Sequence, residues 1–242
     1  MGALPDRSLQ RVTVPGGVEI HFTEEGAGLP LVFVHGGMGD WTSWEPQWAA
    51  FTPYFRCITY SRRYSSPNHN VPDSNNHSVF DEAQDLAHLL AHWCTEPAIL
   101  VGTSYGAYTA LQTALIAPGR VRALAITEPP VLPFADEAPN GRAARLQFQR
   151  EVLDRATAAF SRGDPEAAVR LLTDGINGLA PGEAATPEGR ARRLRNAHAF
   201  NQQQLLSLEQ AQTLQVLHRR QQCAAFEMFV KRRRTHMRIP RQ

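Results

Sequence analysis

The sequence predicts an α/β fold: a mostly parallel sheet with helices on both faces, followed by an inserted helical lid. Short apolar runs that suit strands alternate with helical patterns over the first 133 residues, and helical patterns alone come next. The chain has 242 residues, 43% of them apolar and 20% charged, which is enough for one domain with a sizeable core. We therefore expect a core over residues 1–133, a helical lid over 134–210, and a basic C-terminal segment over 211–242.

The core is expected to begin with a hairpin and to continue with two buried strands. Strand patterns at 10–14 and 18–23 flank Pro15-Gly16-Gly17, which is a turn signal. Residues 31–34 and 55–60 are short apolar runs, typical of strands that are buried on both faces.

The rest of the core alternates helices with strands. Residues 78–93 carry apolar side chains at helical spacing, and Ser78 can cap that helix. A buried strand is predicted at 98–101, a helix over 105–117, and a further strand over 121–127. This order implies a parallel sheet with helical crossovers.

The lid is predicted to consist of helices only. Residues 143–160 have a helical apolar face, and Asp164-Pro165-Glu166 is a strong helix start, with Gly175 as a plausible stop. A polar helix or pair of helices is expected over about 187–210.

Basic residues are concentrated at the C-terminal end of the chain. Residues 213–242 contain eight lysines and arginines and one acid, Glu227, giving +7; the net charge is +2, so the other residues sum to −5. A mildly acidic body is not expected to bind nucleic acid. The basic run at 231–234 either contacts an anionic surface or is a solvated end.

Composition disfavours several other classes of function. The lone lysine, Lys231, leaves the body without a residue for Schiff-base chemistry or a phosphate-binding loop. No apolar run approaches the roughly 18 residues that a membrane span needs, and the N-terminus lacks the hydrophobic stretch of a secretory signal. Three scattered cysteines do not suit a disulfide framework. We therefore expect a cytoplasmic protein.

A G-x-S-x-G motif, Gly102-Thr103-Ser104-Tyr105-Gly106, lies between a predicted strand and a predicted helix. A sharp strand-to-helix turn strains the backbone, so the residues two positions away must have almost no side chain. Such a turn lifts the hydroxyl of Ser104 above the sheet and directs the following helix N-terminus toward an oxyanion formed there. This context indicates a serine nucleophile; the alternative is a structural glycine turn.

A second glycine-rich segment, His35-Gly36-Gly37-Met38, follows a buried strand. Glycines there let the backbone N–H of Gly37 or Met38 point at a substrate oxygen, and the N–H of Tyr105 would be the second donor of an oxyanion hole. The alternative is a glycine-rich turn without this role. His35 is expected to brace the loop rather than to act as a general base.

Apolar side chains near this loop are candidates for a substrate pocket. Met38 belongs to the loop and Trp44 follows it, which favours the mouth of a pocket over a purely structural place. Apolar side chains of the lid either roof an acyl pocket or only hold the lid together.

With these segments the chain resembles the α/β-hydrolase superfamily, in particular its lid-bearing serine hydrolase branch. The resemblance rests on strand-His-Gly-Gly at 31–37, Ser61-Arg62-Arg63-Tyr64-Ser65-Ser66-Pro67 after the next strand, and the motif at 102–106. It covers residues 8–130 well and the lid in outline. It implies a mostly parallel α/β-hydrolase sheet with an inserted helical lid.

One segment departs from the family pattern Asp-x-Arg-Gly-x-Gly-x-Ser. Tyr60, Arg63 and Ser65 replace the acid and both glycines, so we expect this loop to keep its place but not its tight geometry. The resemblance also implies hydrolysis of esters, thioesters or amides by Ser104, since members that open epoxides or remove halogens use an aspartate at that position.

The resemblance further implies a histidine after the last strand, held by an acid after the sixth or seventh strand. Glu128, at the end of the predicted strand over 121–127, stands where some relatives place the acid; the alternative is an exposed turn residue. His218 ends an apolar run at 214–217 that resembles a last strand, and it is the candidate base. The rival interpretation is that the C-terminal end is foreign to the fold, which would leave Ser104 without a base.

We therefore expect a cofactor-free serine hydrolase that acts on a small, largely apolar ester, thioester or amide through an acyl-enzyme on Ser104. Its expected partner is that small-molecule substrate, with no nucleic acid, no membrane and no particular oligomeric state. His88 and His92 stand four residues apart on a helix but lack a third ligand, so no metal site is expected. The other hypotheses are a catalytically silent binding protein and a truncated hydrolase without a complete triad.

Overall fold

A single mixed sheet forms the centre of the molecule. The computed structural model describes residues 4, 7–71, 78–177 and 186–200. Within these residues six strands are ordered β1-β2-β4-β3-β5-β6. Their bounds are Gln10–Val14 (β1), Val18–Glu25 (β2), Pro30–Val34 (β3), Arg56–Tyr60 (β4), Ala98–Thr103 (β5) and Val121–Thr127 (β6).

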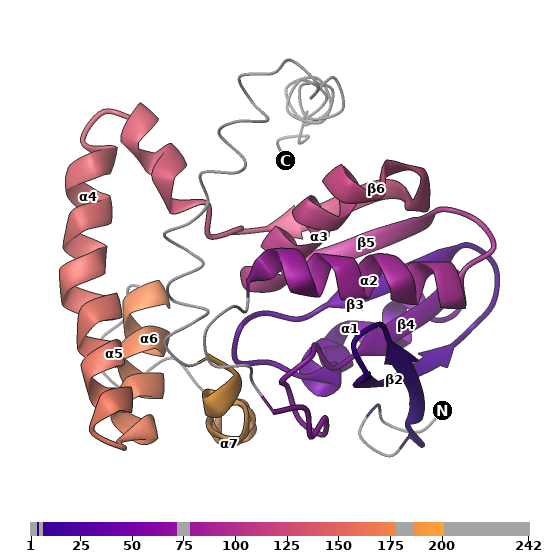
Figure 1. Ribbon diagram of the computed structural model, residues 1–242, viewed down its shortest axis with the longest axis horizontal. Coiled ribbons are helices and arrows are strands. Elements are labelled where there is room, and N and C mark those ends of the chain that lie inside the picture. The colour runs from indigo at the N-terminus through magenta and orange to yellow at the C-terminus, as the bar shows by residue number, and fades with distance from the viewer. Residues whose placement is uncertain (1–3, 5–6, 72–77, 178–185, 201–242) are drawn as a thin grey trace, which may run out of the picture.

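The strand directions follow the predicted pattern. β1 pairs with β2, and β2 with β4, in antiparallel fashion, whereas β4, β3, β5 and β6 are parallel neighbours. The hairpin between β1 and β2 turns on Gly16 and Gly17, whose φ angles of 85° and 76° suit glycine. The predicted α/β fold class with its mostly parallel sheet is confirmed (Figure 1).

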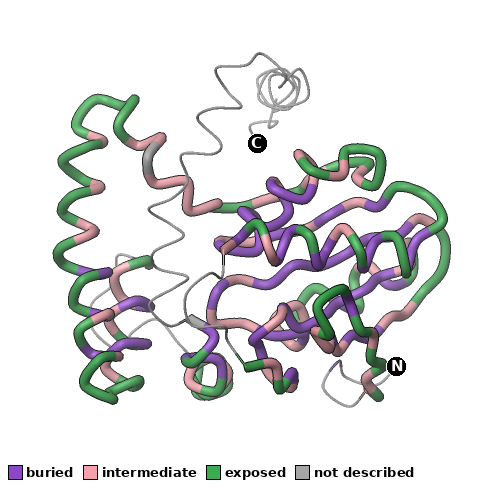
Figure 2. The backbone as a smooth tube through the Cα atoms, viewed as in Figure 1, coloured by how far each residue is buried: buried purple, intermediate pink, exposed green. Residues whose placement is uncertain are grey.

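Helices cover both faces of the sheet. Successive residues of a strand point to opposite faces, so a strand that is apolar throughout needs cover on both sides. In β3, Val32 and Val34 pack with the buried cluster of α2 (Val79–Trp93) and α3 (Tyr105–Ile116). Leu31 and Phe33 face the opposite cluster with Trp41 of η2 (Trp41–Trp44) and the side chains of α1 (Glu45–Phe51). The central strands β3 and β4 are therefore almost completely buried, whereas the edge strands β1 and β6 are largely exposed (Figure 2).

Helix α2 begins where the sequence predicts. Asp81 accepts hydrogen bonds from the backbone N–H and the hydroxyl of Ser78, at 2.7 and 2.9 Å, so the first turn of the helix is capped. The apolar stripe of α2 is fully buried on the sheet at Leu86, Leu89 and Leu90.

Helices alone follow the last described strand. They are η4 (Leu132–Glu137), α4 (Gly141–Phe148), the π-helical η5 (Gln149–Leu153), α5 (Asp154–Ser161), α6 (Pro165–Asn177), α7 (Pro187–Arg195) and η6 (Ala197–Phe200). A further short helix, η3 (Pro118–Arg120), lies between α3 and β6. We call the described residues 141–177 and 186–200 the helical region. None of the helices in the described ranges is both long and apolar enough to span a membrane. The division into core, lid and C-terminal segment stays a prediction.

The helical region differs from the sequence prediction at one glycine. Helix α6 begins at Pro165, as predicted, but it does not end at Gly175 and continues to Asn177. A methyl group on Gly175 would lie 2.4 Å from a side-chain atom of Val152, so the glycine allows α6 to approach η5 closely. The expected stop is therefore wrong, and close helix packing explains the residue.

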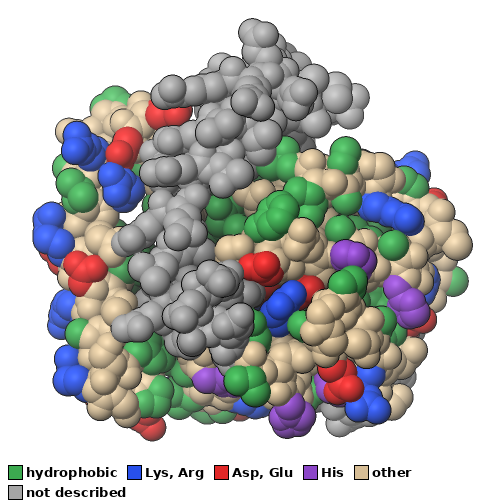
Figure 3. Space-filling view, viewed as in Figure 1, with side chains coloured by type: hydrophobic (Ala, Val, Ile, Leu, Met, Phe, Trp, Pro, Cys, Tyr) green, Lys and Arg blue, Asp and Glu red, His purple; other side chains and the backbone are tan. Residues whose placement is uncertain are grey.

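The outer surface of the helical region carries charges of both signs, as Figure 3 shows on the side of the molecule farthest from the sheet. Arg142, Arg150 and Arg155 on α4, η5 and α5 are exposed, and so are the acids Glu151 and Asp154. Arg145 forms an ion pair with Asp136 at 2.7 Å. These charges keep that side solvated, while the buried side chains of α5 and α6 face each other.

Strand β6 lies at one end of the described sheet. It pairs with β5, and within the described residues no strand pairs with its other edge. Ala123 and Ala125 are exposed on the face that carries η2 and α1 at the other end of the sheet. That face is therefore less covered at β6 than at β3.

Candidate active site

Ser104 sits on a sharp turn between β5 and α3. Its φ of 51° and ψ of −125° lie in a region that residues with side chains rarely adopt. The turn is held on both sides, because the Ser104 N–H donates to the carbonyl of Thr127 at 2.9 Å and the Ser104 carbonyl accepts from Tyr108 at 3.1 Å. The serine is partly exposed, whereas Tyr105 beside it is buried.

The two glycines of the motif are required by close contacts. A methyl group on Gly102 would lie 2.8 Å from backbone atoms of Gly106 and Ala107. One on Gly106 would lie 2.3 Å from the carbonyl oxygen of Val34 and 2.4 Å from that of His35. The start of α3 therefore rests against the end of β3, and this contact sets the position of Ser104.

The glycine-rich segment 35–39, which we call the glycine loop, lies beside Ser104. A methyl group on Gly36 would be 3.5 Å from the Cβ of Ser104, which is ordinary contact. The loop turns on itself through a hydrogen bond from the N–H of Gly39 to the carbonyl of Gly36 at 3.1 Å. Ser104 thus lies against Gly36 of the glycine loop and next to Tyr105, and the oxyanion roles of Gly37 and Tyr105 stay predictions.

His35 is buried within this loop and is neutral. Its Nδ1 lies 2.8 Å from the carbonyl oxygen of Gly36, and its Nε2 accepts the backbone N–H of Arg62 at 2.9 Å. Burial, together with the charge of Arg62, lowers the pKa of His35 to about 3. Both ring nitrogens are engaged in holding loops, which agrees with the prediction that His35 braces the glycine loop.

Two hydrogen-bonded turns form the loop after β4. The backbone N–H of Ser65 donates to the carbonyl of Arg62 at 2.8 Å, and the backbone N–H of Asn68 donates to the carbonyl of Ser65 at 2.9 Å. Apart from glycines, only Ser104, Glu128 and Asn140 have positive φ among the described residues. Residues 63 and 65 therefore do not need glycine here, and the expected departure from the family's loop geometry stays a prediction.

Two buried ionic contacts near the glycine loop were not predicted from the sequence. The first is the ion pair of Arg62 with Glu82, both almost completely buried. The second centres on Asp40, whose carboxylate accepts from the backbone N–H of Thr42 at 3.0 Å and from its hydroxyl at 2.6 Å. The capping pattern of Asp40 is visible in the sequence, but its long-range partners are not.

Asp40 also joins the glycine loop to the end of the helical region. Its other oxygen accepts from Arg195 at 2.6 Å and from Asn196 at 2.9 Å, and Asn196 in turn accepts the backbone N–H of Ser66. Burial alone would raise the pKa of Asp40, but hydrogen bonds from Thr42, Arg195 and Asn196 lower it below its ordinary value. Residues 155 positions apart in the chain are thus locked together by a carboxylate.

Of the candidate acid and base, only the acid, Glu128, lies among the described residues. Thr103 pairs with Thr127, so Glu128, the next residue after β6, lies beside Ser104 at the same edge of the sheet. Glu128 is exposed and has a φ of 51°. His218 lies outside the described residues, so the complete set of Ser104, Glu128 and His218 stays a prediction.

The two predicted pocket residues lie in separate clusters. Met38 packs with Tyr105 and Tyr108 against buried side chains of the helical region. The ring of Trp44 packs on Phe33 with centroids 5.0 Å apart, on the face of the sheet that carries α1.

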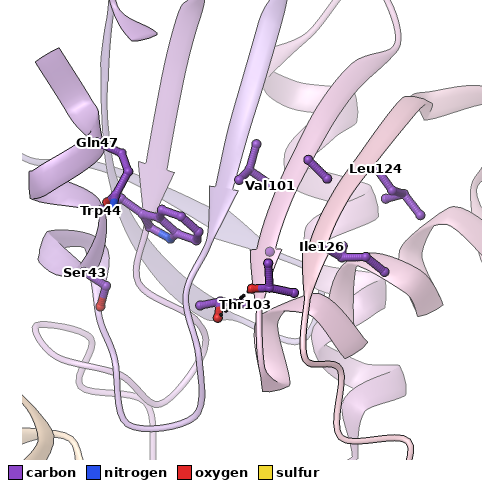
Figure 4. Close-up of a pocket in the computed structure, with 10 residues that line it drawn as sticks. Ser43, Trp44, Gln47, Val101, Thr103, Leu124 and Ile126 are labelled. Atoms are coloured by element: carbon purple, nitrogen blue, oxygen red, sulfur yellow. Dashed lines mark hydrogen bonds between the residues drawn. The ribbon is translucent and has the colours of Figure 1, made fainter. Parts of the chain in front are cut away.

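Trp44 also borders a hollow at the less covered end of the sheet. This cavity of about 540 Å³ is lined by Ser43, Trp44, Gln47, and residues 101–103 and 124–127 (Figure 4). The hydroxyls of Thr127 and Thr103, two of the lining residues, are joined by a hydrogen bond of 3.1 Å (Figure 4). Ser104 follows Thr103 directly in the sequence, but it is not among the residues that line this hollow.

Comparisons with known proteins agree with this geometry. "Bifunctional epoxide hydrolase 2" of Rattus norvegicus is 25% identical over 142 residues, which are 58% of this chain and 25% of that protein. "Uncharacterized hydrolase YraK" of Bacillus subtilis (strain 168) is 29% identical over 119 residues, 49% of this chain and 44% of that protein. This chain therefore spans less than half the length of either relative.

Solved structures and a family model extend the likeness beyond the motifs. An alpha/beta hydrolase from Sphaerobacter thermophilus DSM 20745 superimposes with a TM-score of 0.62 at 25% identity, covering 79% of this chain and 70% of that one. The model of the Alpha/beta hydrolase family matches residues 31–230. With most of its length matched by that model, the chain belongs to the alpha/beta hydrolase family.

Proposed function

We propose that this hydrolase is a serine hydrolase that cleaves a small, largely apolar ester, thioester or amide through an acyl-enzyme on Ser104. The single observation that carries the proposal is the backbone of Ser104, whose φ of 51° holds a partly exposed serine on a tight strand-to-helix turn. A strained conformation of this kind costs about 1–3 kcal/mol and persists only where the surrounding structure imposes it. Here Gly102 and Gly106 impose it by close backbone contact.

In the proposed reaction the Oγ of Ser104 bonds to the carbonyl carbon of the substrate, and its proton passes to His218. The carbonyl oxygen becomes an oxyanion and accepts hydrogen bonds from the N–H groups of Gly37 and Tyr105. His218 then gives its proton to the leaving group, and Glu128 stabilises the imidazolium while it is charged. Water repeats the same steps on the acyl-enzyme and releases the acid.

The glycine loop and the start of α3 suit the oxyanion role. They meet beside Ser104, with Gly36 placed so that a methyl group would touch the Cβ of that serine. The amide at the first residue of α3 carries the partial positive charge of the helix N-terminus. Each well-placed donor lowers the barrier by about 3 kcal/mol.

The residue type at position 104 favours acyl transfer over epoxide opening. One relative is named as an epoxide hydrolase, but members of the family that open epoxides use an aspartate at the position of Ser104. A serine hydroxyl instead suits attack on a carbonyl carbon, with the N–H groups of Gly37 and Tyr105 as the proposed oxyanion donors.

We further propose that the helical region acts as the lid of the site and that Met38 and Trp44 contact the substrate. Met38 packs against a buried cluster that includes Val152, Leu153 and Leu172 of the helical region, so this region adjoins the glycine loop. An apolar boundary of this kind favours an apolar acyl group and excludes water from the oxyanion.

A fluorophosphonate probe tests the proposal, because it forms a covalent bond only with an activated serine. We expect the full-length protein to be labelled at Ser104 by peptide mass spectrometry, and Ser104→Ala to abolish labelling. Thr103→Val is the matched control, since it removes the neighbouring hydroxyl and keeps the shape of the side chain. Absence of labelling in a protein with an intact circular dichroism spectrum would overturn the proposal.

The role of His218 has its own test. His218→Ala should slow labelling by several orders of magnitude if it is the base. An unchanged labelling rate would remove His218 from the mechanism, and ligand binding without turnover would favour a catalytically silent binding protein.

A further inference from the structure

The guanidinium of Arg62 lies directly beneath the proposed oxyanion hole. Its side chain is 1% exposed, and its charge is balanced by Glu82 of α2, which is 2% exposed. A buried pair of this kind is often no more stabilising than apolar residues of the same volume, because both charges lose their hydration. The pair therefore calls for an explanation other than stability of the fold.

Arg62 contacts the glycine loop through its backbone oxygens. One terminal nitrogen donates to the carbonyl of Gly36 at 3.0 Å and to the carbonyl of Gly37 at 3.2 Å. A peptide bond is planar and trans, so its C=O and N–H point in opposite directions. Holding these two carbonyls toward Arg62 turns the N–H groups of Gly37 and Met38 away from it.

The same guanidinium touches the other half of the hole. Its central carbon lies 4.7 Å from the centre of the Tyr105 ring, within the range of a cation–π contact. Tyr105 is buried and is the first residue of α3, and its N–H is the second proposed donor. One charged group thus contacts both segments that supply donors.

We propose that Arg62, neutralised by Glu82, is a positioning residue that sets the two halves of the oxyanion hole relative to each other. This inference rests on the proposed serine hydrolase function. Arg62 does not touch the substrate; it acts through the peptide groups of the glycine loop and through Tyr105. Its loss is expected to slow bond formation at Ser104 and to leave the affinity for uncharged parts of a ligand unchanged.

The neighbouring residue provides a matched control. Arg63 forms a bidentate ion pair with Asp85, with both N···O distances 2.8 Å. Asp85, like Glu82, belongs to α2. This pair links the same loop to the same helix, but its two hydrogen bonds join neither the glycine loop nor Tyr105. Removing it tests the structural link between loop and helix without removing the contact with the oxyanion donors.

The test compares the double variants Arg62→Met/Glu82→Leu and Arg63→Met/Asp85→Leu. Each replaces both charges, so that no unpaired charge is left buried. The rate of covalent labelling by a fluorophosphonate is measured over a range of probe concentrations, which separates the probe's dissociation constant from the rate constant of bond formation. Thermal unfolding of each variant shows whether it is folded at the assay temperature.

For Arg62→Met/Glu82→Leu we expect a rate constant of bond formation lower by about 100-fold, the usual effect of losing one oxyanion donor. The dissociation constant should change by less than about threefold, because ground-state binding is untouched. Arg63→Met/Asp85→Leu should keep the wild-type rate constant. The single variant Arg62→Lys should also be slow, since an ammonium cannot reach Glu82 and both carbonyls in the geometry of a planar fork.

The outcomes separate the two proposals. A labelled wild-type protein whose Arg62→Met/Glu82→Leu variant reacts at the wild-type rate would overturn the positioning role and leave the hydrolase proposal standing. Equal losses in the two double variants would likewise overturn it, because the effect would then be one of general structure. A wild-type protein that takes up no probe would instead overturn the hydrolase function on which this inference rests.

Discussion

Gly106 is the residue at which the fold and the site depend most directly on one contact. Adding a methyl group there places it 2.3 Å from the Val34 oxygen and 2.4 Å from the His35 oxygen, both of them backbone atoms. Ordinary contact begins at 3.4 Å, so α3 and the end of β3 must separate by about 1 Å. Neither backbone oxygen can rotate aside as a side chain would.

We therefore expect Gly106→Ala to lower the free energy of unfolding by about 3 kcal/mol, near the upper end of the range for overpacked sites. The better helix propensity of alanine offsets at most about 1 kcal/mol of the strain. The displaced turn should also slow labelling of Ser104 by about 100-fold, the effect of a 1 Å misplacement in a catalytic site. Urea unfolding followed by tryptophan fluorescence gives the first quantity and probe labelling the second.

Gly119→Ala is the control, because a methyl group there has nothing within 4 Å. It should change the free energy of unfolding by less than about 0.5 kcal/mol. The reasoning would be refuted by a Gly106→Ala protein that unfolds at the wild-type urea concentration and is labelled at the wild-type rate. Such a result would mean that α3 does not rest on the carbonyls after β3.

Two further predictions concern groups that titrate. Folding lowers the pKa of His35 from 6.5 to about 3, so between these pH values the unfolded chain binds a proton that the folded chain does not. The free energy of unfolding should therefore fall as the pH drops from about 6.5 toward 3. His35→Gln keeps an acceptor for the backbone N–H of Arg62 and should flatten this pH dependence in urea unfolding at pH 7 and pH 5; an unchanged dependence would contradict the prediction. Asp40, whose pKa is also lowered, contributes stability above its ordinary pKa of 3.8 that is lost in more acid solution. Asp40→Asn should lower the free energy of unfolding by about 2 kcal/mol, a moderate value because the Arg195 side chain is 48% exposed. It should also speed hydrogen exchange of the backbone amides in α7. Exchange at the wild-type rate there would show that the carboxylate does not hold the helical region.

The features that the sequence predicts well are those encoded by neighbouring residues. Gly102, Ser104 and Gly106 stand within one turn, so the backbone they require can be inferred from their spacing alone. The same holds for the start of α2, where Ser78 and Asp81 are three residues apart. In each case the cause and its effect lie within a few residues of each other.

The features that the sequence does not predict depend on which distant surfaces meet. Asp40 accepts from Arg195 and Asn196, 155 and 156 residues further along, and nothing in either segment signals the other. Gly175 reads as a helix end, because a glycine that ends a helix and one that lets two helices touch have the same local pattern. The position of His218 relative to Ser104 is a question of the same kind and stays a prediction.

The strained dihedral angles of Ser104 have a consequence for anyone who wishes to make this protein more robust. A glycine at that position would adopt the same angles freely, so thermal selection without an activity screen would reward the very replacement that removes the proposed nucleophile. Libraries aimed at heat tolerance should therefore keep codon 104 constant and draw their gains from the solvent-facing sides of the helices instead.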